Sequence, residues 1–342
     1  MPDLRWRLAD DDAGQGALFE EEVERHLGGG EFRGLEFLHV KARTMINEVP
    51  KASAVPFRWT INAYRGCSHA CNYCFARPTH EYLGMNAGDD FDRRIVVKVN
   101  AVERVRAELA PGRWAGDHIA MGTDPYPYQR CEGKYHLTRG IITELAAAAN
   151  PFSVLTKSTL ILRDLDLLAE AATRAQVRAN FSIATLDEDV WRATEPGTPH
   201  PLRRVEAVAR LNAGGVPCGV LLAPVLPGIS DAPEQLEAVV KACVEAGARS
   251  ISPLLLHLRA GVREHYLGWL AGARPDLVHR YQRLYPRAYA PRRTEGELAA
   301  QVRDLVSRHG GRVSGPRRAV AASPSDRRPA APTAPRQLGL GV

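Results

Sequence analysis

Three cysteines stand close together in the segment GCSHACNYCFAR, residues 66–77. Cys67, Cys71 and Cys74 follow a Cys-x3-Cys-x2-Cys spacing, although the whole chain of 342 residues has only six cysteines. A loop with this spacing can bring three thiolates around one soft metal centre, and thiolates suit zinc or iron–sulfur chemistry. A structural zinc site closes with four protein ligands, whereas a cubane held by three cysteines leaves one iron open for a substrate or cofactor.

The remaining cysteines do not complete this group. Cys131, Cys218 and Cys243 lie far away in the sequence and show no paired spacing. We interpret Cys218, in a strand pattern, and Cys243, on the apolar face of a helix, as core residues.

Two histidines offer an alternative. His69 and His80 flank the cysteines and could complete a Cys3His zinc site, which would make the chain a structural or nucleic-acid-binding protein without catalysis.

The elements that must position this loop alternate between strand and helix patterns. Such alternation indicates an α/β protein with a parallel sheet and crossover helices. About six strand–helix units, fewer than the eight of a closed barrel, favour a partial (β/α)6 TIM-like barrel over a doubly wound open sheet. The predicted strands are 57–64, 95–100, 117–123, 152–158, 178–185, 218–228 and 251–258, and the predicted helices are 101–110, 138–149, 162–174, 201–215 and 234–247.

Composition divides the chain into four predicted segments. We expect an N-terminal extension over 1–54 with a helix at 17–27, and a partial barrel over 55–275. A helical segment over 276–312 and a disordered Pro/Ala/Arg-rich tail over 313–342 follow.

The basic charge of the chain is concentrated at its end. From Arg303 onward there are eight Arg and two Asp, a net charge of +6 that equals the charge of the whole chain. The first 302 residues are therefore neutral overall. The tail is either a solvated segment or an arm that binds nucleic-acid phosphates without sequence preference.

The apolar segments of the chain are short and interrupted by proline, and its start, MPDLRWRLADDD, shows no signal peptide. We therefore expect a cytoplasmic protein without a membrane partner. In that reducing compartment clustered cysteines indicate metal ligands or catalytic thiols rather than disulfides.

The cysteine spacing, with Tyr73 just before the last cysteine, resembles the radical S-adenosylmethionine superfamily. The segments NAYRGCSHACNYCFAR and GTDPYPYQ resemble its spore photoproduct lyase-like branch, and the resemblance covers roughly residues 41–260. It implies a lyase or transferase-like enzyme with a [4Fe-4S] cluster on Cys67, Cys71 and Cys74. In that family the cluster, reduced by a small donor such as flavodoxin or ferredoxin, cleaves S-adenosylmethionine to a 5′-deoxyadenosyl radical that abstracts hydrogen from the substrate.

The ends of the following strands carry polar groups suited to that cofactor. By the resemblance, Gly122, Thr123 and Asp124 match the segment that holds the cofactor's amino group. Lys157 resembles the lysine that this branch uses for the methionine carboxylate, and Ser182 matches a serine on its fourth strand.

Three further positions could line the cofactor. Arg203, or its neighbour Arg204, opens a helix and could face the anion. Tyr73 could stack on adenine or fill space, and residues 221–228 could form an apolar wall or ordinary strand packing.

The substrate is where this sequence departs from spore photoproduct lyase. That enzyme returns hydrogen from a cysteine just before the polar residues of the second strand, where this chain has Met121 and Gly122. Cys131 is a candidate substitute donor, with a buried structural thiol as the alternative. The missing cysteine argues against thymine-dimer repair, while a substrate related to nucleic acid stays among the candidates.

Overall fold

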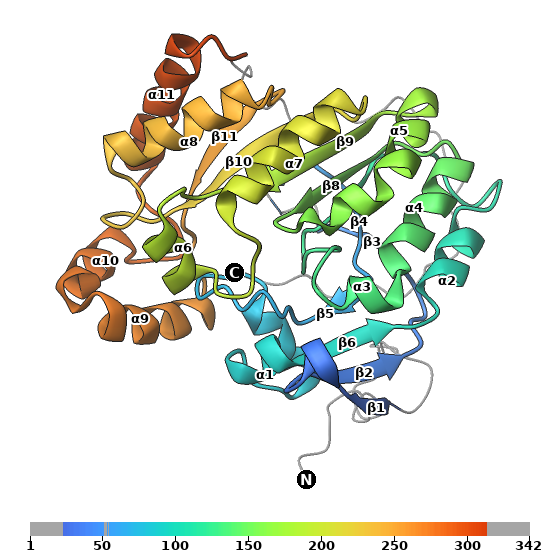
Figure 1. Cartoon of the computed structure of the whole chain (residues 1–342). Coiled ribbons are helices and arrows are strands. Elements are labelled where there is room, and N and C mark those ends of the chain that lie inside the picture. Colours follow the sequence, from blue (N-terminus) through green and yellow to red (C-terminus); the bar gives the residue numbers. More distant parts are fainter. Residues whose placement is uncertain (1–22, 51–52, 54, 313–342) are drawn as a thin grey trace.

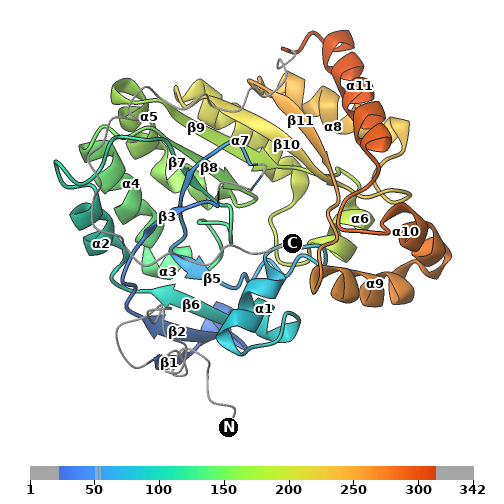
Figure 2. The same ribbon diagram turned by 180° about the vertical axis from the view of Figure 1, so that it is seen from behind.

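The computed structural model describes residues 23–50, 53 and 55–312, shown in two opposite views in Figures 1 and 2. The predicted disordered tail over 313–342 lies outside these described residues.

A seven-stranded sheet forms the centre of the molecule, with the strand order β11-β10-β9-β8-β7-β4-β3. Its six strands from β4 to β11 run parallel, and β3 pairs antiparallel with β4 at one edge. The predicted α/β class and partial barrel are therefore confirmed. The strands are β3 (Ile46–Glu48), β4 (Trp59–Ile61), β7 (Ile119–Met121), β8 (Phe152–Thr156), β9 (Val177–Ser182), β10 (Cys218–Val225) and β11 (Ile251–Leu255).

Helices cover the outer face of this sheet, where α4, α5, α7 and α8 run alongside the strands (Figure 1). A parallel sheet requires such cover because both of its faces are apolar. The helices up to β11 are α1 (Asp89–Arg93), α2 (Ala101–Glu108), α3 (Glu132–Tyr135), α4 (Leu137–Ala147), α5 (Leu165–Arg174), α6 (Glu188–Thr194), α7 (Pro201–Ala213) and α8 (Pro233–Glu245).

Three more helices follow the last strand: α9 (Val262–Ala273), α10 (Val278–Leu284) and α11 (Arg292–Arg308). Figure 2 shows α11 beside α8 and β11, while α9 and α10 lie near α6. On α11, Leu298, Val302 and Leu305 are buried in the same apolar cluster as the barrel strands. No helix among the described residues has the length and apolar character needed to cross a membrane.

A second, four-stranded sheet has the order β1-β2-β6-β5 and lies below the main sheet in Figure 1. Its strands are β1 (Glu24–Leu27), β2 (Glu36–Val40), β5 (Tyr64–Arg65) and β6 (Arg94–Lys98). The predicted strand over 57–64 is thus divided between β4 in one sheet and β5 in the other. The predicted strand over 95–100 is β6, which pairs with β2 and β5 and so does not belong to the barrel.

The N-terminal region differs from the prediction. The helix expected over 17–27 is wrong for residues 24–27, which form β1, and residues 17–22 lie outside the described residues. Antiparallel pairing of β1 with β2 overrides the local helical pattern. Because β3 joins the barrel sheet, the predicted extension over 1–54 shares hydrogen bonds with the barrel. The boundaries of the four segments predicted from composition stay predictions.

Candidate functional site

The three cysteines lie in the loop between β5 and the 3₁₀ turn Arg77–Leu83. Cys67 and Cys71 are buried, and Cys74 is partly exposed. The Cys74 backbone N–H donates to the carbonyl oxygen of Cys71 over 3.2 Å, which folds the loop on itself. Gly66 has a φ of +76°, and a Cβ there would stand 2.8 Å from the Arg94 carbonyl oxygen, so glycine is required before the first cysteine.

Arg77 anchors this loop from within. Its side chain is fully buried, and Nε and Nη2 both donate to the Cys71 carbonyl oxygen, at 3.1 and 3.0 Å. An ion pair of 2.9 Å with Asp92 balances the buried charge. This role is not visible in the sequence, because nothing in the pattern CFAR shows that its arginine points inward.

The three thiols share one loop without forming a tight group. Among the described residues, Glu24, His26 and His39 form the only group of three or more His, Cys, Asp or Glu whose ligand atoms all lie within 4.8 Å of one another. The three sulfur atoms are therefore not all within 4.8 Å of one another. Three thiolates can bind a cluster, in which each holds a different iron, or one tetrahedral zinc that needs a fourth ligand.

Burial favours the neutral, protonated form of the cysteine thiols. Burial, and next the neighbouring thiols Cys74 and Cys71, raise the pKa of Cys67 well above its ordinary value. Burial likewise raises the pKa of Cys74 to about 11. A cation bound among them would reverse this preference by stabilising thiolates.

The two flanking histidines are placed differently. His80 Nε2 lies 2.9 Å from the Arg94 carbonyl oxygen, which occupies that nitrogen. His69 is buried within the cysteine loop, and burial, with the Arg204 and Lys157 cations, lowers its pKa to about 3. His69 is therefore neutral at physiological pH.

Lys157 follows directly after β8 and is 1% exposed. Its Nζ donates to Ser182 Oγ on β9 over 2.8 Å and to Glu195 Oε1 over 3.0 Å. Ser182 Oγ in turn donates to the Ala223 carbonyl oxygen on β10 over 2.6 Å. The structure thus brings two of the predicted residues into one hydrogen-bonded chain at the carboxyl ends of adjacent barrel strands.

Glu195 is the centre of a buried ionic group that the sequence analysis did not identify. It accepts a hydrogen bond from the Tyr73 hydroxyl and forms ion pairs with Lys157 and Arg204. Burial alone would raise the pKa of Glu195, but the Arg204 and Lys157 cations lower it to about 2. Tyr73, predicted beside adenine, is thereby tied to this carboxylate, and its ring centre lies 5.5 Å from Lys157 Nζ.

The segment that carries Glu195 packs against the cysteine loop. Gly197 N–H donates to the His69 carbonyl oxygen over 3.0 Å, and Asn72 N–H donates to the Thr194 carbonyl oxygen over 3.1 Å. These bonds join residues more than a hundred positions apart, so the ionic group and the cysteine loop form one site.

The two neighbouring arginines have opposite placements. Arg204 is 1% exposed, and its Nη1 donates to the Ser182 carbonyl oxygen over 3.1 Å. The Arg203 side chain is 74% exposed and faces Glu206 at 3.4 Å. The structure therefore does not bring Arg203 to the other predicted residues. Arg204 lies beside Ser182 instead, because on helix α7 it is Arg204 that faces the barrel.

The end of β7 carries Gly122, Thr123 and Asp124, all at least partly buried. A Cβ on Gly122 would lie 2.1 Å from the Leu155 carbonyl oxygen, so close approach to β8 explains this glycine. Asp124 Oδ1 is buried without a hydrogen-bond partner. Burial raises the pKa of Asp124 to about 6, and the Arg65 and Lys98 cations oppose that rise.

Cys131 and the predicted apolar wall belong to packed regions. Cys131 is 0% exposed at the start of α3, which agrees with the alternative of a buried structural thiol. In β10, Leu222 and Val225 are likewise fully buried in the core. Cys218 and Cys243 are buried there too, which confirms their interpretation as core residues.

The arrangement has the groups needed to hold a charged cofactor beside a thiolate-bound metal. Ser68 Oγ, His69 Nδ1 and Asp124 Oδ1 are buried polar atoms that lack partners in the described part of the chain. A buried acceptor of this kind suits an ammonium, and Lys157 suits a carboxylate. The donor set therefore fits an iron–sulfur cluster with an amino-acid-bearing cofactor.

Comparisons with known proteins agree with this chemistry. A family model described as the Radical SAM superfamily matches residues 61–243. An uncharacterized protein of Mycobacterium tuberculosis is 43% identical over 300 residues, which is 87% of this chain and 88% of that protein. A protein of Methanocaldococcus jannaschii, also uncharacterized, is 27% identical over 197 residues, covering 58% of this chain and 70% of its own length.

Solved structures of spore photoproduct lyase share the fold. One mutant of that enzyme superimposes with a TM-score of 0.58 at 19% identity, covering 81% of both chains. The enzyme complexed with dinucleoside spore photoproduct gives 0.55 at 16% identity, again over 81% of both chains. At this level of identity the likeness concerns the fold alone.

Proposed function

The chain belongs to the radical SAM superfamily and is an enzyme of that type, and we propose that it carries one [4Fe-4S] cluster on Cys67, Cys71 and Cys74 and acts on S-adenosylmethionine. The observation that carries this proposal is the contact of the three-cysteine loop with the buried group of Lys157, Ser182 and Glu195. A structural zinc site has no need of such a buried group of charges beside it, whereas a charged cofactor does.

The cofactor's amino-acid end has two complementary partners in this site. Asp124 offers a buried oxygen without a partner for the ammonium group. Lys157 Nζ uses two of its three N–H bonds on Ser182 and Glu195, which leaves the third for the carboxylate. We propose that Glu195 acts as a positioning residue, since its ion pair aims Lys157 and its hydrogen bond holds Tyr73.

The protein's own contribution to the reaction is orientation and exclusion of water. When bound, the reduced cluster would supply the electron that cleaves S-adenosylmethionine to methionine and a 5′-deoxyadenosyl radical. Lys157, Ser182 and Arg204 are each 1% exposed, so their charges and dipoles act in a site with little water. The candidate role of Cys131 as a hydrogen donor stays a prediction, and this proposal does not depend on it.

The partners follow from the same chemistry. We propose that a small electron donor such as flavodoxin or ferredoxin reduces the cluster from the side of Cys74, the one partly exposed cysteine of the three. A nucleic-acid substrate and a cytoplasmic location stay predictions. Truncation after Arg303 tests the role of the Arg-rich tail, since salt-sensitive nucleic-acid binding that depends on it should then disappear.

Anaerobic reconstitution with iron and sulfide tests the cluster assignment. We expect about four iron atoms per chain and 5′-deoxyadenosine formation from S-adenosylmethionine with a chemical reductant. Cys67→Ala should lose both, because one thiolate ligand is missing. Cys243→Ala is the matched control, since that buried cysteine lies in the core and should leave iron content unchanged. A colourless protein that holds one zinc and makes no 5′-deoxyadenosine would overturn the proposal.

A further inference from the structure

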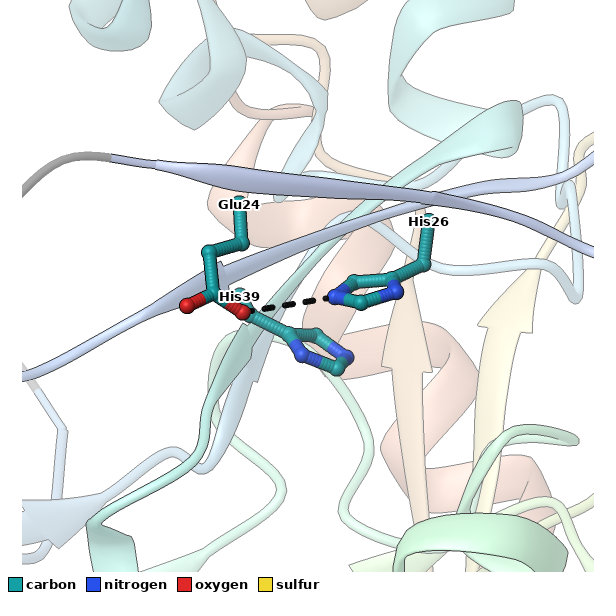
Figure 3. Close-up of side chains that lie close together, drawn as sticks. All are labelled: Glu24, His26 and His39. Atoms are coloured by element: carbon teal, nitrogen blue, oxygen red, sulfur yellow. Dashed lines mark ion pairs between the residues drawn. The ribbon is translucent and has the colours of Figure 1, made fainter.

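A second group of possible metal ligands lies on the four-stranded sheet, away from the barrel strands. Glu24 and His26 on β1 and His39 on β2 lie close together, as Figure 3 shows, and the ring centres of the two histidines are 4.0 Å apart. We propose that these three side chains bind one divalent transition-metal ion, for which zinc is the probe, separately from the cysteine loop. This proposal does not depend on the function proposed for the barrel.

Strand register explains why the three side chains meet. Glu24 is paired directly with His39 across the antiparallel strands. Side chains at positions i and i+2 of a strand share a face, so His26 stands on the same side as Glu24 and diagonal to His39. Two adjacent strands therefore present three ligands on one face, without any loop.

The distances approach those of a real site. His26 Nε2 lies 3.5 Å from Glu24 Oε2, and all three ligand atoms lie within 4.8 Å of one another. Tetrahedral zinc with ligand bonds of about 2.0 to 2.1 Å separates its ligand atoms by ~3.3 Å. One pair is already near that value. Rotation of exposed side chains closes the rest, because Glu24 and His26 are 76% and 45% exposed.

Tyr135 supports the third ligand. His39 Nε2 lies 2.8 Å from the Tyr135 hydroxyl, which leaves Nδ1 as the nitrogen for the metal. Metal-binding histidines usually donate their other ring nitrogen to such a partner, which fixes the tautomer and the ring orientation. Tyr135 comes from the last residue of α3, so the site would join the second sheet to the barrel layer.

The bound ion would stabilise the sheet edge. All four residues of β1 are exposed, and β2 is its only strand neighbour among the described residues. A metal held by β1 and β2 together closes that edge, while the three protein ligands leave a fourth position for water.

Cobalt(II) titration of the full chain, with its cluster reconstituted first, tests this site. We expect one cobalt per chain in an environment of nitrogen and oxygen ligands, without the thiolate charge-transfer band that binding to the cysteine loop would produce. His26→Ala and His39→Ala should each abolish this binding. Tyr135→Phe should weaken it by about 10- to 100-fold, because the ring stays but the hydrogen bond is lost.

His279→Ala on α10 is the control, since this exposed histidine is not part of the group. Zinc should also slow amide hydrogen exchange in residues 24–27 of the parent chain but not of His26→Ala. Cobalt binding that is equally tight in the two histidine variants, or that shows only thiolate ligands, would overturn the proposal. A chain that fails to take up a cluster but keeps this cobalt site would contradict the barrel proposal alone.

Discussion

The barrel site and the Glu24–His26–His39 group both present charged or metal-binding side chains, but they differ in burial. Lys157 and Glu195 have side chains only 2% exposed, whereas Glu24 and His26 are largely accessible to water. A buried charge must be paired within the protein, and an exposed one need not be. Folding therefore organises the barrel site in advance, while a bound ion would have to organise the surface group.

The largest expected effect comes from removing the central charge of the barrel site. Glu195→Gln leaves Lys157 and Arg204 buried without their carboxylate, which should lower the free energy of unfolding by about 3 to 5 kcal/mol. Denaturant unfolding of the full chain measures this. A change below about 0.5 kcal/mol would mean that the group is not buried as described.

Two neighbouring arginines offer an internal contrast of the same kind. Arg204→Ala removes a buried partner of Glu195 and should cost about 3 kcal/mol in the free energy of unfolding. Arg203→Ala should change it by no more than about 0.5 kcal/mol, because that side chain is 74% exposed. Equal costs for the two variants would contradict the inward orientation of Arg204.

Lys157→Ala separates binding from cluster assembly. We expect S-adenosylmethionine to bind more weakly by about 1.5 to 3 kcal/mol, the contribution of a charged hydrogen bond, with iron content unchanged. Equilibrium binding to the reconstituted variant measures this. Lys241→Ala on the exposed side of α8 is the matched control and should bind as the parent does. Unchanged affinity of Lys157→Ala would remove this lysine from the cofactor site.

The smallest effect is expected at the surface group. Without metal, His26→Ala should alter the free energy of unfolding by less than about 0.5 kcal/mol, because no buried group loses its partner. With zinc present, only the parent chain should gain stability, since an ion that binds the native state alone stabilises it by mass action. If His26→Ala without metal lowered the free energy of unfolding by several kcal/mol, the surface group would be organised by folding as the barrel site is, which contradicts the proposed difference.

Local pattern was sufficient where a residue's role depends on its neighbours in the chain. The cysteine spacing, the alternation of strands and helices, and the polar ends of β7 and β8 are all visible in a short window, and they predicted the partial barrel and the position of the loop. The helix over 17–27 failed at residues 24–27 because β2, a distant partner in the chain, decides the conformation there.

Sequence alone thus determined which chemistry is present: three clustered thiols, a lysine after β8 and a serine in β9. Only the tertiary structure decided which charges meet. Glu195 contacts Lys157, Arg204 and Tyr73, and Lys157 and Tyr73 are 38 and 122 positions away from it in the chain. Of two consecutive residues on α7, Arg204 faces this group and Arg203 faces solvent. A short stretch of sequence does not show that these charged residues pair. Each charge needs its partner because it is buried, and it becomes buried only when the chain folds.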